Sequence, residues 1–199
     1  MKTSLGKGKT PLSMVQDWLD FAKSKNIQDH NAIALATSDQ EGIPNVRMVL
    51  LKEIDTNGFI FYTNYTSTKG SEISHRSNVA FSLHWRTLKR QVRVKGMAEI
   101  LEPEKSDEYF HSRPLDSRYG AWASKQSREL PSKKLLVNSV ARIAMKFGNS
   151  PPRPEFWGGY RIIPSEIEFW SEGKFRIHDR IRWIRNQQNS KWESIRLYP

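Results

Sequence analysis

Hydrophobic residues recur at helical spacing near the start of the chain, after a basic segment without periodicity. The pattern predicts an amphipathic helix that begins at an N-cap on Ser13 and runs to about Lys25. Its predicted buried face consists of Val15, Trp18, Leu19 and Ala22. We expect residues 1–11 to form a flexible N-terminal segment, because they combine charge with glycine and lack an apolar face.

After residue 31 the pattern changes to short runs of β-branched and aromatic residues separated by polar turns, which is typical of strands. Asn57-Gly58 between two of these runs is a strong hairpin signal. A short helix is expected at residues 67–76. The predicted strands in this part are residues 32–37, 43–54, 59–64, 79–85 and 91–101. Their order favours an antiparallel meander.

Helical signals return in the middle of the chain. Pro103 suits the first position of a helix, and Pro114 ends that helix and allows a new turn through Trp122. Residues 130–147 form a third helical stretch. Its predicted buried face consists of Leu136, Val140, Ile143, Ala144 and Phe147.

The last part of the chain returns to strand-like runs, which are FWGGYRI, EIEFWSEG, FRIHDRIRWIR and KWESIRLY. Short strands with helices inserted between them predict a mainly β, α+β fold, an antiparallel barrel with peripheral helices. We find no internal repeat and no convincing domain boundary. Residues 12–199 are therefore expected to form a single domain.

Composition narrows the possible partners. The formal net charge of +11 would attract nucleic acid, an acidic membrane surface or small phosphorylated ligands. The chain lacks cysteine, which excludes disulfides and thiolate catalysis, and its five histidines lack metal-binding spacing, so no metal site is expected. Apolar runs stay below about 18 residues and no secretory leader is visible, so we expect a cytoplasmic protein without a membrane partner.

One group of basic residues lies in FRIHDRIR. Strand alternation would send Arg176, His178, Arg180 and Arg182 to one face, which would then be strongly cationic. Such a face would bind an anion, or it would be the solvated outer face of an edge strand. This run alone does not decide between the two.

A second pair, Arg47 and Lys52, brackets the apolar part of RMVLLK. If this strand is buried in a barrel, cations at its ends suggest a bound anion. Residues five apart face opposite sides of a regular strand, so the two would contact different parts of a ligand unless a β-bulge intervenes. The alternative is a pair of cations that reach solvent from the strand ends.

A third group combines Tyr109 and Arg113, four apart on one helical face, with Ser117 beyond the break at Pro114. Phenol, guanidinium and hydroxyl together would bind a phosphate. Taken singly, Tyr109 is more often a core aromatic residue and Ser117 a helix cap.

Eight short motifs, RMVLLK, FYTN, RQVRV, YFHSRP, KQS, FWGG, EFW and RIHDR, follow one another between residues 11 and 199. In order and spacing the sequence resembles the pyridoxamine 5′-phosphate oxidase family. The resemblance implies an FMN-binding split β-barrel, antiparallel and Greek-key-like with peripheral helices. It also implies a homodimer with two flavins at the interface, each surrounded by residues of both subunits.

The resemblance further assigns site residues. Arg47 and Lys69 would hold the FMN phosphate, and Thr68 replaces an arginine that is usual in the family, which implies weaker FMN retention. The implied FMN site consists of Arg47, Met48, Val49, Leu50, Leu51, Lys52, Tyr62, Thr63, Thr68, Lys69, Gln91, Gln126, Ser127, Trp170 and Arg180. The implied substrate site consists of Lys52, Tyr109, Arg113, Ser117, Arg176 and His178, of which the last two would be catalytic.

The implied reaction oxidises pyridoxamine or pyridoxine 5′-phosphate to pyridoxal 5′-phosphate, with hydride transfer from C4′ to flavin N5 and reduction of O₂ to H₂O₂. A dihydrophenazine-type oxidase of the same fold is an alternative, although Lys52, Tyr109 and Arg113 favour a phosphorylated substrate. A non-catalytic flavin- or haem-binding split barrel would not require Arg176 and His178. Nucleic-acid binding is suggested only by charge and aromatic residues, so no nucleic-acid partner is expected.

Overall fold

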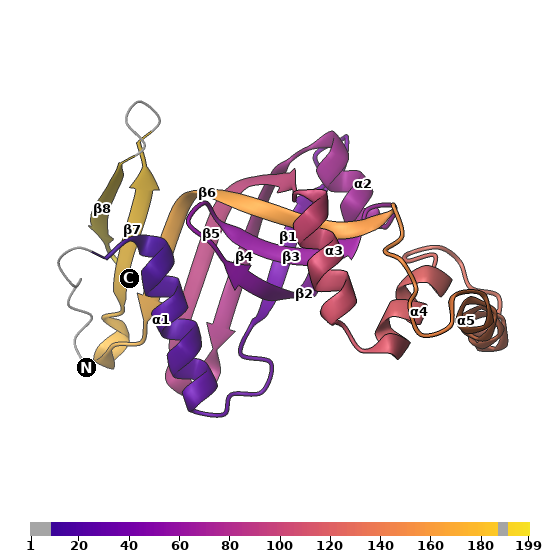
Figure 1. Ribbon diagram of the computed structural model, residues 1–199. Helices are drawn as coiled ribbons and strands as arrows, with labels where there is room; N and C mark the ends of the chain where they lie inside the picture. The colour runs from indigo at the N-terminus through magenta and orange to yellow at the C-terminus, as the bar shows by residue number, and fades with distance from the viewer. Residues whose placement is uncertain (1–8, 187–190) are drawn as a thin grey trace.

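An antiparallel sheet of eight strands organises the computed structural model, which describes residues 9–186 and 191–199. The strands are hydrogen-bonded in the order β3-β2-β1-β4-β5-β6-β7-β8, and β3 also pairs with β6. This pairing closes the first six into a barrel, with β7 and β8 as an extension (Figure 1). The strands are β1 (Ala32–Ser38), β2 (Pro44–Ile54), β3 (Phe59–Asn64), β4 (Asn78–Trp85), β5 (Arg90–Ile100), β6 (Trp157–Ser171), β7 (Asp179–Arg185) and β8 (Trp192–Leu197).

Helices surround the barrel. They are α1 (Pro11–Ser24), α2 (Thr68–His75), α3 (Pro103–Ser112), α4 (Leu115–Ala123) and α5 (Lys133–Phe147), with short 3-10 turns η1 (Arg86–Leu88) and η2 (Lys174–Arg176). After the meander of β1 to β3, the chain crosses through α2 and places β4 beside β1, a Greek-key-like connection. Helices α3 to α5 gather at the end of the molecule opposite β7 and β8 (Figure 1). In the described part of the chain, no helix is long and apolar enough to cross a membrane.

Helix α1 begins earlier than the sequence pattern predicted. Thr10, not Ser13, is the N-cap, because its side chain accepts a hydrogen bond from the Ser13 N–H at 3.2 Å. Pro11 then occupies the first turn, where its missing N–H is not needed. The predicted flexible segment falls mostly on residues 1–8, which lie outside the described residues.

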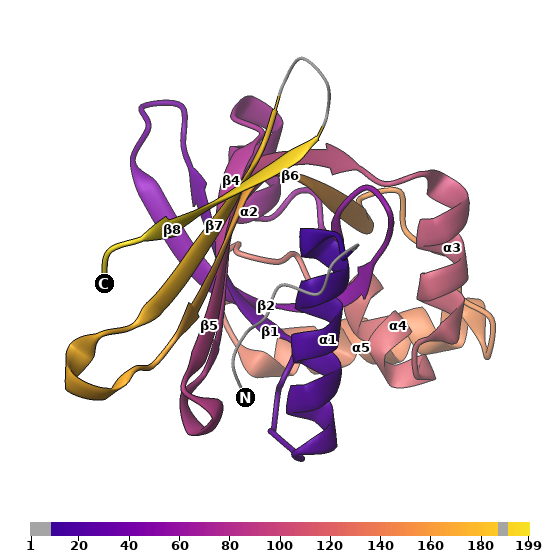
Figure 2. The same ribbon diagram turned by 90° about the vertical axis from the view of Figure 1, so that its left-hand side faces the viewer.

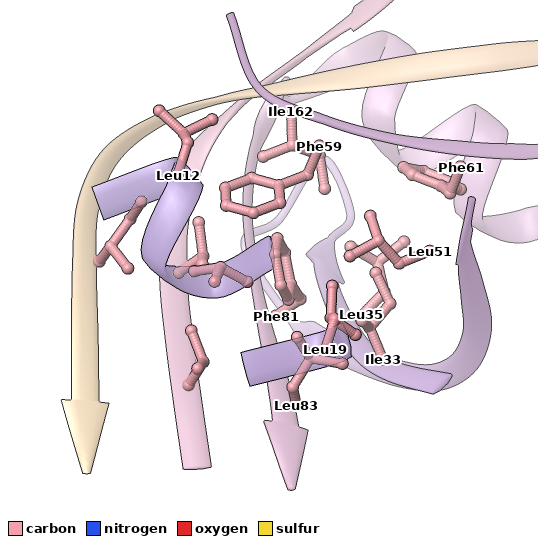
Figure 3. Close-up of a cluster of buried hydrophobic side chains, with 14 of the residues drawn as sticks. Leu12, Leu19, Ile33, Leu35, Leu51, Phe59, Phe61, Phe81, Leu83 and Ile162 are labelled. Atoms are coloured by element: carbon pink, nitrogen blue, oxygen red, sulfur yellow. The ribbon is translucent and has the colours of Figure 1, made fainter. Parts of the chain in front are cut away.

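The core fills the barrel and is covered by α1, which lies across one end of it (Figure 2). Leu12 and Leu19 of α1 point toward the strands (Figure 3). Strands β1, β4 and β5 contribute alternate residues, such as Ile33 and Leu35 of β1, because successive side chains of a strand face opposite sides. The predicted buried face of α1 is confirmed, since all four of its residues are buried.

The barrel is split between β2 and β3. β2 pairs with β1 from Pro44 to Leu50, but with β3 only from Leu51 to Ile54, where a β-bulge shifts the register. Within the described chain, the edge of β2 that precedes Leu51 therefore faces β3 without strand pairing. Its N–H and C=O groups are available to a ligand or another chain. The predicted mainly β, split antiparallel barrel with peripheral helices is confirmed.

The last third of the chain differs from the prediction in its first two strands. FWGGYRI and EIEFWSEG form one continuous strand of 15 residues, β6, rather than two. Pro164 does not break it, because the register with β5 shifts at that point, beside Lys95 and Gly96. A proline is tolerated at such a bulge, where one ladder hydrogen bond is already missing.

Helix α5 carries its predicted apolar stripe, but none of its residues is fully buried. Leu136, Val140 and Ile143 are half-buried, and the helix packs on α4 at the edge of the molecule (Figure 1). The prediction is thus correct about which residues form the inner face of α5. It is wrong about their burial, because within a single chain they are only half-buried. Local periodicity shows which side of a helix is apolar, not how much of the protein covers it.

Candidate active site

A cleft of about 940 Å³ opens where β2 and β3 separate, and it is bounded by residues of α2, α3 and α4. Its volume lies in the range of cofactor and substrate sites. Most predicted site residues line it. They are Arg47, Met48, Val49, Leu50, Lys52, Tyr62, Thr63, Thr68, Lys69, Tyr109, Arg113, Ser117, Gln126 and Ser127.

Arg47 and Lys52 line this cleft together although they lie five residues apart on β2. Residues of both faces of β2 line the cleft, among them Met48 and Val49, and a register shift between Leu51 and Glu53 places a β-bulge beside Lys52. A β-bulge is therefore present, and Arg47 and Lys52 also lie on opposite faces of β2, both of which contribute to the cleft.

Lys69 is a buried cation near the start of α2, 7% exposed. Its Nζ donates hydrogen bonds to Oγ1 of Thr63 at 3.2 Å and to Oε1 of Gln126 at 3.3 Å, which are uncharged partners. Burial, with a contribution from Arg47, lowers the pKa of Lys69, while Glu72 acts in the opposite direction. An anion in the cleft would offset the free-energy cost of burying this charge.

Arg47 is held by a buried polar network. Its Nη2 donates to Oε2 of Glu72 at 2.8 Å, and its Nη1 donates to the Leu35 carbonyl at 3.3 Å and to Thr37 Oγ1. Thr37 and Asn45 also donate to the Glu72 carboxylate. Burial would raise the pKa of Glu72, but these hydrogen bonds and the charge of Arg47 outweigh it and lower the pKa, so the carboxylate stays ionised.

Three aromatic rings stack along another wall of the cleft. The Tyr62 and Tyr109 centroids are 3.9 Å apart, and Trp157 lies 5.7 Å from Tyr62 with its ring nearly parallel. Burial is the main reason that the pKa of Tyr62 is raised to about 12, so its phenol stays protonated at neutral pH. The stack forms a flat apolar surface with polar edges.

Two cations flank these rings. The guanidinium of Arg113 lies 4.6 Å from the Trp157 ring centroid, and Nζ of Lys52 lies 6.0 Å from the Tyr109 ring centroid. Nη1 of Arg113 is buried without a hydrogen-bond partner among the described residues. A buried unpaired donor of this kind is costly unless a ligand satisfies it.

The lining is therefore cationic and partly aromatic. Arg47, Lys52, Lys69 and Arg113 contribute to it, and among the described residues no carboxylate does. Such a cleft suits planar ring compounds that carry phosphate groups.

A second group of predicted residues lies outside the cleft, on β5, β6 and the region of β7. Gln91 is paired with Trp170 across β5 and β6, and Trp170 with Arg180 across β6 and β7, so the three form one row. The His178 ring lies 4.9 Å from that of Trp170, and its Nδ1 accepts a hydrogen bond from the Gly173 N–H. In one chain, the row and the cleft are separate.

The predicted single face of Arg176, His178, Arg180 and Arg182 is wrong for its first two members. β7 begins only at Asp179, and Arg176 belongs to η2. Phe175 and Arg176 have positive φ angles of 54° and 63°, which breaks the alternation of a strand. The sequence offers no glycine or other turn signal at these two positions to reveal the break.

Arg180 and Arg182 do share a face, but it is not strongly cationic. Nε of Arg180 donates to Glu168 at 2.8 Å, Arg93 lies 3.6 Å from the same carboxylate, and Arg182 is 3.9 Å from Glu166. The acidic residues come from β6, so strand pairing balances the charge that β7 alone suggested.

Leu51 is the remaining predicted residue, and its side chain points into the core, 3% exposed. Some lining residues were not predicted. They are Asn45, Asn64, Pro114, Gly120, Ala121, Ser124 and Trp157. Asn64 and Trp157 belong to FYTN and FWGG, so their motifs could have indicated them.

Comparison with known families gives two matches that together cover most of the chain. Residues 22–147 match the family described as pyridoxamine 5′-phosphate oxidase. Residues 157–199 match the pyridoxine 5′-phosphate oxidase C-terminal dimerisation region. The second match contains Trp170, Arg176, His178 and Arg180.

Two bacterial proteins named pyridoxine/pyridoxamine 5′-phosphate oxidase are similar along nearly their whole length. The protein of Cereibacter sphaeroides (strain ATCC 17029 / ATH 2.4.9) is 52% identical over 198 residues, which cover 100% of this chain and 99% of the relative. The protein of Ruegeria sp. (strain TM1040) is 51% identical over 192 residues, 96% of either chain.

Among solved structures, PhzG from Burkholderia lata 383 in complex with tetrahydrophenazine-1-carboxylic acid has a TM-score of 0.91 at 31% identity, covering 98% of this chain and 95% of its own. A pyridoxamine 5′-phosphate oxidase-related, FMN binding protein from Nostoc punctiforme PCC 73102 shares the fold, with a TM-score of 0.77 at 15% identity and 96% and 99% coverage. From the family match and the full-length relatives together, the chain belongs to the pyridoxamine 5′-phosphate oxidase family of FMN-dependent oxidoreductases.

Proposed function

We propose that this protein binds FMN and oxidises pyridoxamine 5′-phosphate and pyridoxine 5′-phosphate to pyridoxal 5′-phosphate. The observation that carries the proposal is that one cleft holds two cationic groups beside a stack of aromatic rings. Arg47 and Lys69 form the first group, and Lys52 and Arg113 form the second. The proposed cofactor and the proposed substrate each carry one phosphate and one ring system, so the two groups match two phosphates.

The lining fits FMN. Lys69 is buried with uncharged partners, and Arg47 is fixed beside it, so an anionic phosphate would complete both. The unpaired edge of β2 between Met48 and Leu50 offers backbone hydrogen-bonding groups to a flavin ring. When bound, FMN would supply the redox chemistry, taking a hydride from C4′ of the substrate to N5 and passing electrons to O₂ to give H₂O₂.

The second cationic group is proposed to hold the substrate phosphate. Arg113 has an unpaired buried Nη1, Lys52 lies at the Tyr109 ring, and Ser117 lines the same part of the cleft. Fixing the phosphate positions the pyridine ring and reduces the entropy lost on reaching the transition state. These residues would bind and orient the substrate and neutralise the charge of its phosphate.

Arg176 and His178 are proposed to come from a second copy of the chain. They lie away from the cleft of their own chain, within the part that matches a dimerisation region. Val46, Met48 and Leu50 on the outer face of β2 are 64%, 63% and 42% exposed, and a homodimer interface would bury them. We infer that residues 12–199 act as one domain, because one sheet runs through both family matches.

A dihydrophenazine-type oxidase is the nearest alternative, because PhzG has the same fold. The phosphate-binding character of Lys52, Arg113 and Tyr109 favours a phosphorylated substrate over a phenazine carboxylic acid. The two named relatives at 51–52% identity also support the vitamin B6 substrate.

The proposal is tested by incubating the FMN-reconstituted protein with pyridoxine 5′-phosphate in air. We expect pyridoxal 5′-phosphate and H₂O₂ to form in equal amounts. If reconstituted protein oxidises a reduced phenazine but not pyridoxine 5′-phosphate, the proposed substrate is wrong. If it binds FMN and oxidises neither compound, the non-catalytic alternative holds.

A further inference from the structure

The Glu72 carboxylate lies beneath the cationic lining of the cleft. It is 8% exposed and accepts hydrogen bonds from Thr37, Asn45 and Arg47, which come from β1 and β2. Glu72 itself stands on α2, one turn after Lys69. It therefore connects the helix that carries one phosphate-binding cation to the strand that carries the other.

The donors of Arg47 are divided between protein and cleft. A guanidinium has five N–H groups. Nη1 uses its two on the Leu35 carbonyl and Thr37, and Nη2 uses one on Glu72. Among the described residues, Nε–H and the second N–H of Nη2 have no partner, and these two form the edge of a guanidinium that binds phosphate bidentately.

We propose that Glu72 is a positioning residue that turns this edge of Arg47 toward the cleft and so determines the preference of the protein for FMN over riboflavin. The inference rests on the proposed function, because it assigns Arg47 to the flavin phosphate. Glu72 does not line the cleft and contacts the ligand only through Arg47.

The position and the charge of the Glu72 side chain are expected to have opposite effects on FMN binding. A carboxylate near a phosphate repels it, so charge alone predicts that removing Glu72 strengthens FMN binding. Position predicts the opposite, because Arg47 without its anchor loses the fixed orientation on which bidentate binding depends. The conservative variants Glu72→Gln and Glu72→Asp separate the two effects.

Glu72→Gln keeps the reach of the side chain and removes its charge. Its amide oxygen can accept from Arg47 and Thr37, and its NH₂ group can donate to Asn45 after the Asn45 amide rotates. Glu72→Asp keeps the charge but is shorter by one methylene, so the carboxylate no longer reaches Arg47. Glu41→Ala is a matched control for net charge, because Glu41 is exposed in the β1–β2 turn.

The experiment measures the dissociation constants of FMN and riboflavin for each variant by flavin fluorescence, with melting temperature as a check on folding. We expect Glu72→Asp to weaken FMN binding about 10-fold and leave riboflavin binding unchanged, because the displaced Arg47 would lose one charge-assisted hydrogen bond to the FMN phosphate. Glu72→Gln should bind FMN within about 3-fold of the unmodified protein or more tightly. Glu41→Ala should change neither constant.

Loss of FMN preference in Glu72→Gln but not in Glu72→Asp would overturn the inference, because the variant that keeps the reach of the side chain would then fail while the shorter one succeeds. Equal weakening of FMN and riboflavin by Glu72→Asp would also overturn it, since the residue would then act on the whole fold. An unmodified protein that binds riboflavin as tightly as FMN would instead refute the assignment of Arg47 and Lys69 to the flavin phosphate.

Discussion

Tyr109 of α3 stacks on Tyr62 of β3 with ring centroids 3.9 Å apart and ring planes inclined by 16°. The contact fixes the Tyr109 ring in the cleft without using its hydroxyl group, which has no hydrogen bond within the described residues. The ring and the hydroxyl can therefore be tested separately. We propose that the ring contributes to folding and that the hydroxyl binds the substrate phosphate.

We predict that Tyr109→Phe raises the KM for pyridoxine 5′-phosphate about 10-fold, because it removes one hydrogen bond to a charged group. The melting temperature should stay unchanged, since the stack is kept. Tyr109→Ala should also lower the melting temperature, because it removes the stack. Steady-state kinetics and thermal unfolding of the two variants check this. An unchanged KM in Tyr109→Phe would show that the hydroxyl does not bind the substrate.

FMN binding should weaken at high pH because of Lys69. Burial lowers the pKa of this lysine below its usual 10.5, so the free protein loses the ammonium as pH rises through the lowered pKa. The dissociation constant of FMN should then rise with pH below 10.5, and Lys69→Gln should bind weakly with little dependence on this pH range. Titrating the FMN dissociation constant between neutral pH and pH 10.5 provides the measurement.

The lowered pKa of Lys69 affects the stability of the apoprotein in the opposite direction to its effect on FMN binding. Unfolded Lys69 keeps its proton up to its usual pKa, so in this window the unfolded chain binds more protons and the apoprotein becomes more stable as pH rises. An FMN affinity that stays constant up to pH 10.5 in the unmodified protein would contradict a role for the Lys69 ammonium.

The cleft and the second group of predicted residues, which includes His178, lie apart in one chain. If two copies of the chain build each site, inactive variants of the two groups should complement each other. Arg113→Ala damages the cleft, and His178→Ala damages the group on β5 to β7. When the two are unfolded together and refolded, half of the dimers should be mixed, and each mixed dimer has one intact site. Activity should thus recover to about one quarter of that of the unmodified protein.

The control mixes Arg113→Ala with Lys52→Ala, both of which damage the cleft. Each site of such a mixed dimer contains a damaged cleft, so activity should not recover. Failure of the first mixture to regain activity, or equal recovery in the control, would argue against a site built from two copies.

We expect the ion pairs of the buried Arg161 to contribute more to stability than ion pairs on the surface. It is 5% exposed and binds Asp55 at 2.9 Å, Glu102 at 3.0 Å and Glu99 at 3.3 Å, which joins the β2–β3 hairpin to the start of α3. Arg161→Met should lower the free energy of unfolding by about 2 kcal/mol, because it removes charge-assisted hydrogen bonds, among them those to Asp55, whose side chain is only 14% exposed.

Arg196→Met is the matched control. Arg196 pairs with Asp179 on the surface, where both side chains are more than half exposed. Its loss should cost less than about 1 kcal/mol. Urea unfolding at equal protein concentration compares the two, and similar values for both variants would show that burial does not strengthen the Arg161 network.

Most of the fold could be predicted from local patterns. Alternation fixes which residues of β1, β4 and β5 face the core, and helical spacing fixes the buried face of α1, because these properties belong to single elements. The start of α1 depends on the competition between Thr10 and Ser13 as N-cap. The continuity of β6 across Pro164 depends on a β-bulge that β6 shares with β5. Patterns within one element do not contain that information.

The candidate site was predictable in membership but not in arrangement. The motifs indicated Lys52 and Arg47 together, yet both faces of β2 line one cleft only because β2 pairs with β3 no earlier than Leu51. The turn at Phe175 and Arg176 has no sequence signal, and the burial of Glu72 has none either, because a helical carboxylate is usually solvated. The weaker FMN retention expected from Thr68 stays a prediction.

The most direct measurement is anaerobic reduction of the bound flavin. FMN-reconstituted protein is mixed without oxygen with pyridoxine 5′-phosphate, and in parallel with unphosphorylated pyridoxine at the same concentration. We expect the yellow flavin absorbance to bleach with the phosphorylated compound and to remain with the other, because Lys52, Tyr109 and Arg113 are proposed to bind the phosphate. Flavin that stays oxidised with pyridoxine 5′-phosphate, or that bleaches equally with both compounds, would contradict the proposed oxidase.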